Sequence, residues 1–488
     1  VIRMKKKLVV VGSGQYNYDV IKVREYPEGF ILGKRNAFVD KVHTEEAGGT
    51  CGNVMCMMQH LGWDARPQVK LTHGVDGQNM SASLKHFGCD TRYVMLVEGG
   101  GFSGWECIHR KNKDTGEHEM GYHGYGPEGS RFRKITELKI KDEVPALLCQ
   151  MEGDAPDVYF FDHSEAGPRA IAAALREKGT LVYYECENAK DKGKFIKSVE
   201  VADIVKFSDE NVPDVSFCAE FPDKLFIQTQ GGKGMVFRLP MTDEWVKVDA
   251  VPVDKVVDWE GCGDTTTAVF LVELGKIGLP RVASLTVEQV NSALEAAAKK
   301  AAQCTQYYGS KGWVYAENKA LIGGHTKIKK NDCTYPEMWN EDNKRVKVFL
   351  AGPIIGGGNW QQKLISRFAG DNRILLINPY GPDPNHNLEV KASWEVKGLA
   401  ESDVVVFWLP LQKGKLHDGR EYARTTRFEM GEWMTKKEHV ILGIESGFPG
   451  EGYIRFRAKA YNIDIHESFD ALIEGIKAKL AELAKNHE

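Results

Sequence analysis

The chain has 488 residues, of which 42% are hydrophobic and 27% charged, and its formal net charge is −4. One hydrophobic core seldom serves a chain of this length, so we expect at least two domains. The slightly negative charge excludes a general attraction to nucleic acid or to an anionic membrane surface. No apolar run approaches the ~20 residues that span a bilayer.

The ten cysteines contain no C-x-x-C pair. This spacing fits neither a zinc site nor a small disulfide-linked scaffold. We therefore expect mostly buried, reduced thiols in a cytoplasmic protein that has neither nucleic acid nor a membrane as a partner.

Short apolar segments of strand length alternate with helical stretches through the first part of the chain. They lie at residues 7–14, 157–162, 180–185, 202–208 and 224–232. Continuous apolar strands separated by helices are typical of a mostly parallel sheet with helices on both faces. Residues 91–120 differ, because apolar and polar residues alternate there around glycines and a "KDTGE" turn. This pattern predicts a small antiparallel flap.

Two glycine-rich turns stand directly before helical segments. The first, "GGTCGNVMCMMQHLG", covers residues 48–62, and the second, "DWEGCGDTTTA", covers residues 258–268. Asp264 lies where the second turn meets its helix, a place that favours an anion. Because Asp is also a preferred N-cap, Asp264 is either an ordinary cap or a catalytic base beside a phosphate cradle.

A polar segment without periodicity, residues 326–345, predicts a linker. After it the strand-like runs return, with helices between them, at residues 346–353, 372–379, 402–410 and 438–444, and a final helix is predicted at 468–484. We therefore expect a first domain at residues 1–325 and a second, smaller α/β domain at residues 346–488.

The two glycine turns together resemble the ribokinase-like (PfkB) family of sugar and nucleoside kinases, which carries G-G-x-x-x-N and G-A-G-D signatures. Three further segments resemble family segments in the expected order: "VVGSGQYNYDVI", "THGVDGQNMSASLKHFG" and "QTQGGKG". The resemblance covers roughly residues 5–322. It implies a ribokinase-like three-layer fold with a small antiparallel lid over the central sheet.

This resemblance also implies roles for individual residues. Asp264 would be the base that takes the proton of an acceptor hydroxyl. The residues that would hold the acceptor are Asp19, Gly48, Gly49 and Asn53; those of the anion hole are Gly261, Cys262 and Gly263; and those beside the nucleotide are Lys206, Ser208, Thr229, Gly231 and Gly234.

The implied cofactors are ATP and Mg²⁺, with a monovalent cation as a further candidate, and we predict no direct side-chain ligand to metal. Three positions depart from the family pattern: Cys262 replaces an alanine, Asn79 replaces a glycine, and Asn211 stands where K-x-N-x-x-E or K-x-S-x-x-E has a carboxylate. The Asn211 departure leaves open an altered metal dependence or a weakened activity.

Residues 346 to about 465 resemble the nucleoside 2-deoxyribosyltransferase-like family through "LAGP", "WE", D-x-x-x-F-W, F-E-x-G and Y-x-R. The resemblance implies a flavodoxin- or Rossmann-like parallel sheet and a nucleophile, Glu429, that attacks C1′ of a nucleoside or nucleotide. The implied substrate-binding residues are Gly352, Pro353, Trp394, Glu395, Asp403, Tyr453 and Arg455.

Together, the two family resemblances predict a bifunctional enzyme. One domain would phosphorylate a sugar or nucleoside hydroxyl with ATP, and the other would cleave or transfer at an N-glycosidic bond. The alternatives are a nucleotide-binding regulatory protein with one or both sites impaired, and a simple sugar kinase with an accessory ligand-binding domain. In each case we expect small-molecule substrates or ligands and a homo-oligomer.

Overall fold

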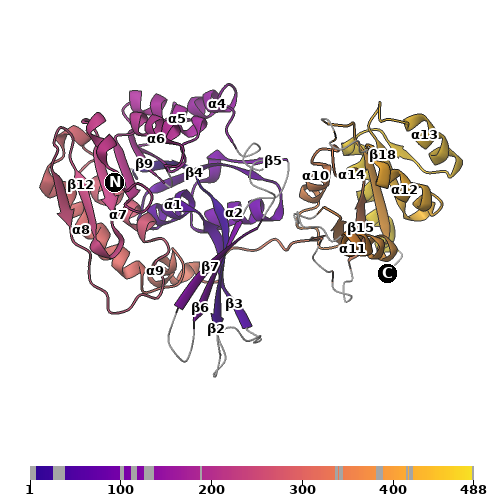
Figure 1. The fold of residues 1–488 in the computed structure, drawn as a ribbon, viewed down its shortest axis with the longest axis horizontal. Helices are drawn as coiled ribbons and strands as arrows, with labels where there is room; N and C mark the ends of the chain where they lie inside the picture. Colours follow the sequence, from indigo (N-terminus) through magenta and orange to yellow (C-terminus); the bar gives the residue numbers. More distant parts are fainter. Residues whose placement is uncertain are drawn as a thin grey trace, which may run out of the picture. The chain divides into compact units, whose positions relative to one another are not determined.

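The computed structural model describes residues 7–25, 39–98, 104–111, 118–125, 137–186, 189–335, 339, 345–380, 388–413, 416 and 421–485. The chain forms two compact units, the first made mainly of residues up to Lys327 and the second mainly of residues from Ile328 onward (Figure 1). Among the described residues, none of the helices has the length and hydrophobicity that a bilayer span requires. The cysteines whose side chains are described are free thiols, and most are buried.

The first unit is built on a nine-stranded sheet with the order β13-β12-β11-β10-β9-β8-β1-β4-β5. The strands from β11 to β4 in this order pair in parallel, and β12 and β13 add an antiparallel edge. The bounds are β1 (Val9–Ser13), β4 (Asp64–Thr72), β5 (Val94–Val97), β8 (Val158–Phe161), β9 (Leu181–Glu185), β10 (Ile204–Ser208), β11 (Leu225–Thr229), β12 (Met235–Arg238) and β13 (Trp245–Val248).

Helices cover both faces of this sheet, because successive strand residues enter two separate hydrophobic clusters. Val10 and Tyr183 belong to one cluster, and their neighbours Val11 and Tyr184 belong to the other. The first face carries α1 (Thr50–His60), α2 (Val75–His86), α7 (Cys262–Lys276), α8 (Val287–Cys304) and α9 (Gly312–Glu317); the second carries α4 (Glu143–Met151), α5 (Ala166–Glu177) and α6 (Lys192–Val201). The predicted three-layer architecture is confirmed.

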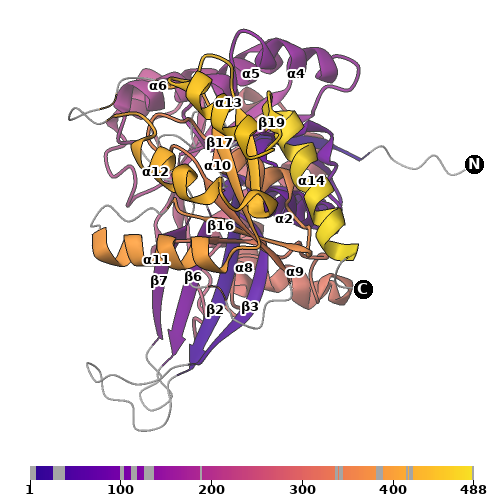
Figure 2. The ribbon, with the colours of Figure 1, turned by 90° about the vertical axis from the view of Figure 1, so that its right-hand side faces the viewer.

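A separate four-stranded sheet forms the lid, in the order β3-β2-β6-β7, and its strands run side by side away from the core (Figure 2). The strands are β2 (Asn17–Glu25), β3 (Val39–Gly48), β6 (Gly104–Lys111) and β7 (His118–Tyr125). The outer pairs are antiparallel, as predicted for a lid, but the central pair β2–β6 is parallel. The strands of each antiparallel pair are neighbours in the chain. In contrast, β2 and β6 are far apart in the sequence, so the local sequence pattern does not predict that they pair.

The second unit has a six-stranded parallel sheet with the order β14-β16-β15-β17-β18-β19. The strands are β14 (Asp332–Thr334), β15 (Val346–Ala351), β16 (Ile374–Asn378), β17 (Val404–Leu409), β18 (Val440–Ile444) and β19 (Ile465–His466). Helices α11 (Leu388–Glu401), α12 (Arg424–Trp433) and α13 (Glu451–Ala460) pack on one face, and α10 (Trp360–Arg367) and α14 (Phe469–Lys485) pack on the other. The predicted parallel α/β fold is confirmed.

Strand β14 lies inside the segment that the sequence predicts as a linker. Its three residues pair with β16 through the backbone, and Cys333 enters the hydrophobic core of the second unit. A strand of this length is too short for an alternating pattern to reveal it. Part of the segment 326–345 therefore belongs to the second sheet.

Candidate active sites

The start of α7 positions Asp264. Gly261 is the N-cap residue and has a left-handed backbone with φ of 75°. A Cβ on Gly261 would lie 2.3 Å from the Cβ of Ser310, so only glycine fits this turn. Asp264 lies in the first turn but is not the N-cap; instead its Oδ2 accepts a hydrogen bond of 2.7 Å from Nδ2 of Asn53. The capping alternative therefore does not describe this carboxylate.

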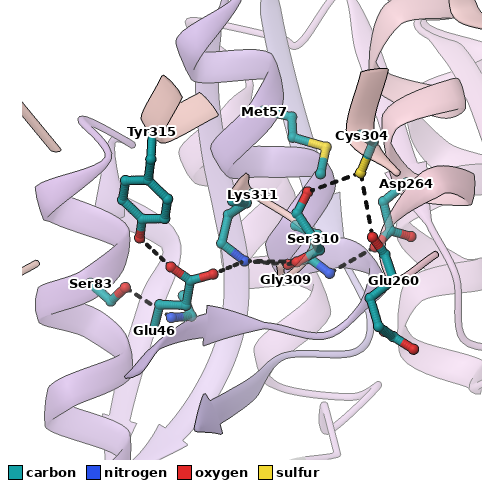
Figure 3. A network of polar contacts seen from close by, with 12 residues as sticks. Glu46, Met57, Ser83, Glu260, Asp264, Cys304, Gly309, Ser310, Lys311 and Tyr315 are labelled. Atoms are coloured by element: carbon teal, nitrogen blue, oxygen red, sulfur yellow. Dashed lines mark hydrogen bonds and ion pairs between the residues drawn. The ribbon is translucent and has the colours of Figure 1, made fainter. Parts of the chain in front are cut away.

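Asn53, on α1, joins the two glycine turns. Its Nδ2 faces Asp264, and its Oδ1 accepts hydrogen bonds from Oγ of Ser310 at 2.9 Å and from Nζ of Lys311 at 2.5 Å. Figure 3 shows Lys311 between Glu46 on one side and Ser310 and Asp264 on the other. The two signature turns, 211 positions apart at Asn53 and Asp264, thus meet in one polar cluster.

The environment of Asp264 favours its neutral form. Burial, reinforced by the Glu185 carboxylate, raises the pKa of Asp264 to about 7, although the hydrogen bond from Asn53 and the charge of Lys206 act in the opposite direction. A carboxylate with this pKa can both accept and release a proton near neutral pH. The site has the chemistry of a general base.

The acceptor side of the site is formed where β2 and β3 reach α1. Asp19 pairs with Glu46 across these strands. A Cβ on Gly48 would lie 1.6 Å from Oδ2 of Asp19, so the carboxylate occupies the room that the glycine leaves. Gly49 is the N-cap of α1 with φ of 77°. Burial raises the pKa of Asp19 to about 7, while the nearby Lys311 ammonium lowers it.

The residues expected beside the nucleotide gather at the carboxyl ends of β10 and β11. Ser208 and Thr229 are directly opposite each other there. Gly231 and Gly234 follow with φ of 54° and 96°, and a Cβ on Gly234 would lie 2.2 Å from the carbonyl oxygen of Val248. These glycines make a tight backbone turn at the carboxyl edge of the sheet, where ligands bind in parallel α/β proteins, and the resemblance places ATP at this turn.

Lys206 is buried and already engaged. Its Nζ donates to the carbonyl oxygen of Gly263 at 2.7 Å and to Oγ1 of Thr267 at 2.9 Å, and it forms an ion pair with Glu185. Lys206 therefore ties the anion-binding turn to the sheet, rather than presenting a free ammonium to a phosphate. Asn211, at the position of the missing carboxylate, donates its backbone N–H to Oγ of Ser208 at 3.1 Å.

Glu185, Glu46 and Lys311 also belong to this polar cluster, and the sequence motifs did not predict them. A carboxylate that ends a buried strand, as Glu185 ends β9, is a usable signal, since ligands bind at that edge of a parallel sheet. Nothing local marks the other two. Within the described ranges, no group of three or more His, Cys, Asp or Glu side chains is placed to hold a metal ion.

A cavity of about 610 Å³ lies beside this polar cluster. Its lining includes Tyr307, Tyr308 and Tyr315, with the ion pair of Glu45 and Lys327. The hydroxyl of Tyr315 donates to the buried Glu46 carboxylate, so the cavity and the cluster share a wall.

In the second unit, the structure brings Glu429 and Glu395 together. Burial raises the pKa of Glu429 to about 7, and the carboxylates of Glu395 and Glu432 add to the effect. Burial also raises the pKa of Glu395, opposed by Lys391, whose Nζ lies 3.8 Å from its carboxylate. The described residues provide no hydrogen-bond donor to the Glu429 carboxylate. Two carboxylates of unequal environment are suited to acid–base and nucleophilic roles.

Gly352 and Pro353 lie just past the carboxyl end of β15, where the sequence predicts a ligand crevice. A Cβ on Gly352 would lie 2.5 Å from the carbonyl oxygen of Trp408. The carbonyl oxygen of Pro353 accepts a hydrogen bond of 3.2 Å from Nε1 of Trp360. The turn is therefore a tightly packed backbone element.

Other predicted residues have structural contacts. Trp394 is buried edge-to-face against Tyr335 and Trp339 in the core. Asp403 precedes β17 at its amino end, and its Oδ2 accepts the backbone N–H of Lys347 at 2.8 Å. The structure thus packs Trp394 in the core and places Asp403 at the edge of the sheet opposite Gly352.

Tyr453 and Arg455 lie on the first turns of α13, which follows β18. Tyr453 is exposed. The guanidinium of Arg455 pairs with Glu451 at 2.9 Å and with Glu467 at 2.6 Å. These two carboxylates already pair with the positive charge of Arg455, which the resemblance assigns to substrate binding.

Residues 5–313 match the family model of pfkB family carbohydrate kinases, which is more than half of the chain. The chain belongs to this family. Residues 345–448 of the pfkB protein match a second model, described as nucleoside 2-deoxyribosyltransferase like. Both predicted resemblances are confirmed, in the predicted order.

Solved structures similar to the pfkB protein include a ribokinase from Giardia lamblia, at 14% identity over 64% of this chain and 96% of that chain, with a TM-score of 0.48. A nucleoside kinase from Burkholderia thailandensis in complex with inosine has 16% identity over 65% and 99%, with a TM-score of 0.42. A nucleoside kinase from Methanocaldococcus jannaschii has 14% identity over 63% and 95%, with a TM-score of 0.43. A comparison with curated protein sequences finds no match.

Proposed function

We propose that this pfkB protein is a bifunctional enzyme that phosphorylates a sugar or nucleoside hydroxyl with ATP and acts on an N-glycosidic bond. The observation that carries the kinase half is the hydrogen bond from Asn53 to Asp264, which joins both signature turns around a carboxylate with a pKa of about 7. The glycosidic half is supported by the match at residues 345–448 and by the buried Glu429, whose pKa the Glu395 carboxylate raises further.

In the proposed phosphorylation, Asp19 and Asn53 orient the acceptor, and Asp264 takes the proton of the acceptor hydroxyl. The hydroxyl oxygen attacks the γ-phosphorus, the bond from that phosphorus to the bridging oxygen breaks, and ADP leaves. The backbone N–H groups at the start of α7 stabilise the negative charge that develops on the transferred group. Ser208, Thr229, Gly231 and Gly234 would hold ATP. Bound ATP with magnesium supplies the phosphoryl group and neutralises its charge.

In the proposed second reaction, the ionised Glu429 attacks C1′, and the bond from C1′ to the base breaks. A negative carboxylate stabilises the oxocarbenium-like transition state. Glu395, whose pKa is raised by burial, is suited to protonate the departing base. Water or a second base then takes the sugar from Glu429, giving hydrolysis or transfer respectively.

The decisive experiment incubates the protein with nucleosides and sugars, ATP and Mg²⁺, and follows ADP, free base and sugar phosphate together. Asp264→Asn keeps the size of the side chain and removes the base, so ADP formation should fall by ~10² or more. Base release from a nucleoside 5′-monophosphate should continue in this variant, which makes it the control for folding. Near-normal ADP formation by Asp264→Asn would contradict the proposed role.

The second candidate is a nucleotide-binding regulatory protein. Asn211 in place of a carboxylate and the engaged Lys206 favour it, because both alter the phosphate side of the first site. Calorimetry distinguishes the two. ATP that binds with micromolar affinity and is never turned over in the presence of any tested acceptor would support regulation, and turnover would exclude it.

A further inference from the structure

The orientation of the Asn53 amide determines whether Asp264 has a hydrogen-bond donor. A side-chain amide has one end that accepts hydrogen bonds and one that donates them. If the amide turned by 180°, its oxygen would face the carboxylate, and two acceptors would oppose each other. The contacts around Oδ1 therefore control whether Asp264 has a donor.

Lys311 selects the observed orientation because an ammonium can only donate. Its Nζ lies 2.5 Å from Oδ1 of Asn53, and the side chain is fully buried. Ser310 adds a second donor to the same oxygen, but its hydroxyl can also accept and so does not by itself determine the orientation.

Glu46 keeps Lys311 charged and in place. Its Oε1 lies 3.0 Å from Nζ of Lys311, and its other oxygen accepts the hydroxyl of Tyr315. Burial alone would lower the pKa of Lys311, but the Glu46 carboxylate, together with Asp19 and Cys56, holds that pKa above its usual value. Figure 3 shows the resulting row from Tyr315 through Glu46 to Lys311.

We propose that Lys311, held by Glu46, is a positioning residue that orients the Asn53 amide so that it donates to Asp264. This inference rests on the proposed kinase function of that site. Lys311 acts on Asp264 through the amide of Asn53. Removing Lys311 should therefore change the protonation of Asp264, whereas removing a purely structural ion pair should not.

The test variant is Lys311→Met combined with Glu46→Gln, which removes both charges and leaves neither one buried alone. In the pH profile of kcat for ADP formation, the acid limb should move to higher pH by roughly one unit, because Asp264 loses its oriented hydrogen-bond donor. At pH 7, kcat should fall several-fold while KM for ATP stays unchanged. The effect should largely disappear in an Asn53→Ala background, where there is no amide to orient.

Tyr315→Phe is the matched control, since it removes a contact to Glu46 and leaves Lys311 paired. It should lower the melting temperature without moving the pH profile. If the doubly substituted protein fails to fold, Glu46→Gln alone replaces it and should move the acid limb in the same direction by a smaller amount. An unchanged acid limb, or effects of Lys311 and Asn53 that simply add, would overturn the proposal.

An NMR titration of Asp264 tests the positioning role of Lys311 independently of kinase activity. ¹³C-labelled aspartate carboxyl signals, assigned to Asp264 by comparison with Asp264→Asn, report its titration directly. A raised titration midpoint in the doubly substituted protein supports the positioning role even if no acceptor is phosphorylated, whereas an unchanged midpoint overturns it. Absence of ADP formation by the unsubstituted protein would count against the kinase function alone.

Discussion

Asp264 on α7 and Glu429 on α12 have the same pKa of about 7 for different reasons. Burial raises both. Around Asp264 the Glu185 carboxylate adds to the effect, and a hydrogen bond from Asn53 and the charge of Lys206 oppose it. Around Glu429 it is reinforced by Glu395 and Glu432. The two carboxylates should therefore respond differently to the loss of one neighbour: removing the Asn53 donor should raise the pKa of Asp264, whereas removing the Glu395 carboxylate should lower the pKa of Glu429.

The largest expected effect comes from removing the nucleophile of the second site. Glu429→Gln should reduce base release by ~10³ or more, because an amide cannot form the covalent intermediate. ADP formation should stay within experimental error of the unsubstituted protein, which also serves as the control for folding. Product analysis by chromatography measures both, and base release at a normal rate would remove Glu429 from the mechanism.

A large effect on stability, without a direct role in chemistry, is expected at Trp394. Trp394→Ala should lower the free energy of unfolding of the second unit by about 3–5 kcal/mol, since it empties a buried space between Tyr335 and Trp339. Tyr453→Ala, at an exposed position, is the matched control and should change stability by less than about 0.5 kcal/mol. Urea denaturation measures both. A stable Trp394→Ala protein with a raised KM would instead make this residue a substrate contact.

A smaller effect is expected on the acceptor side of the kinase site. Asp19→Ala should raise KM for the acceptor by ~10-fold, because it removes a hydroxyl-binding carboxylate, and should leave KM for ATP nearly unchanged. Initial-rate kinetics with each substrate varied in turn give the two values. Equal changes in both would indicate that Asp19 supports the fold of the lid base rather than the acceptor.

The smallest effects separate the two sites most sharply. Each carboxylate must be ionised to act, so both reactions should lose activity as pH falls through about 7. Asn53→Ala should move the acid limb of phosphorylation to higher pH, because a donor to the charged form is lost. Glu395→Gln should move the acid limb of base release to lower pH, because a like charge is lost, and should also lower the rate of base release, because the proposed acid is removed. Shifts in the same direction would refute the comparison.

Much of the fold and part of the sites could be predicted from the sequence. Apolar strands, glycine turns and helical stretches are local patterns, so the three-layer first unit and the parallel second unit were predictable. The same holds for Gly48, Gly261 and Asp264, since a turn that only glycine can make leaves its mark in a few adjacent residues. No local sequence pattern predicts the short strand β14 or the parallel pairing of β2 with β6.

What only the tertiary structure decided is which side chains face one another. Asn53 and Lys311 are 258 positions apart, and Asn53 and Asp264 are 211 apart, so no local pattern connects them. Trp394 and Asp403 matched family motifs, yet one is packed in a core and the other binds the backbone of Lys347. The physical reason is that a motif specifies residue types and spacing, whereas burial, charge and donor orientation depend on strands and helices brought together from distant parts of the chain.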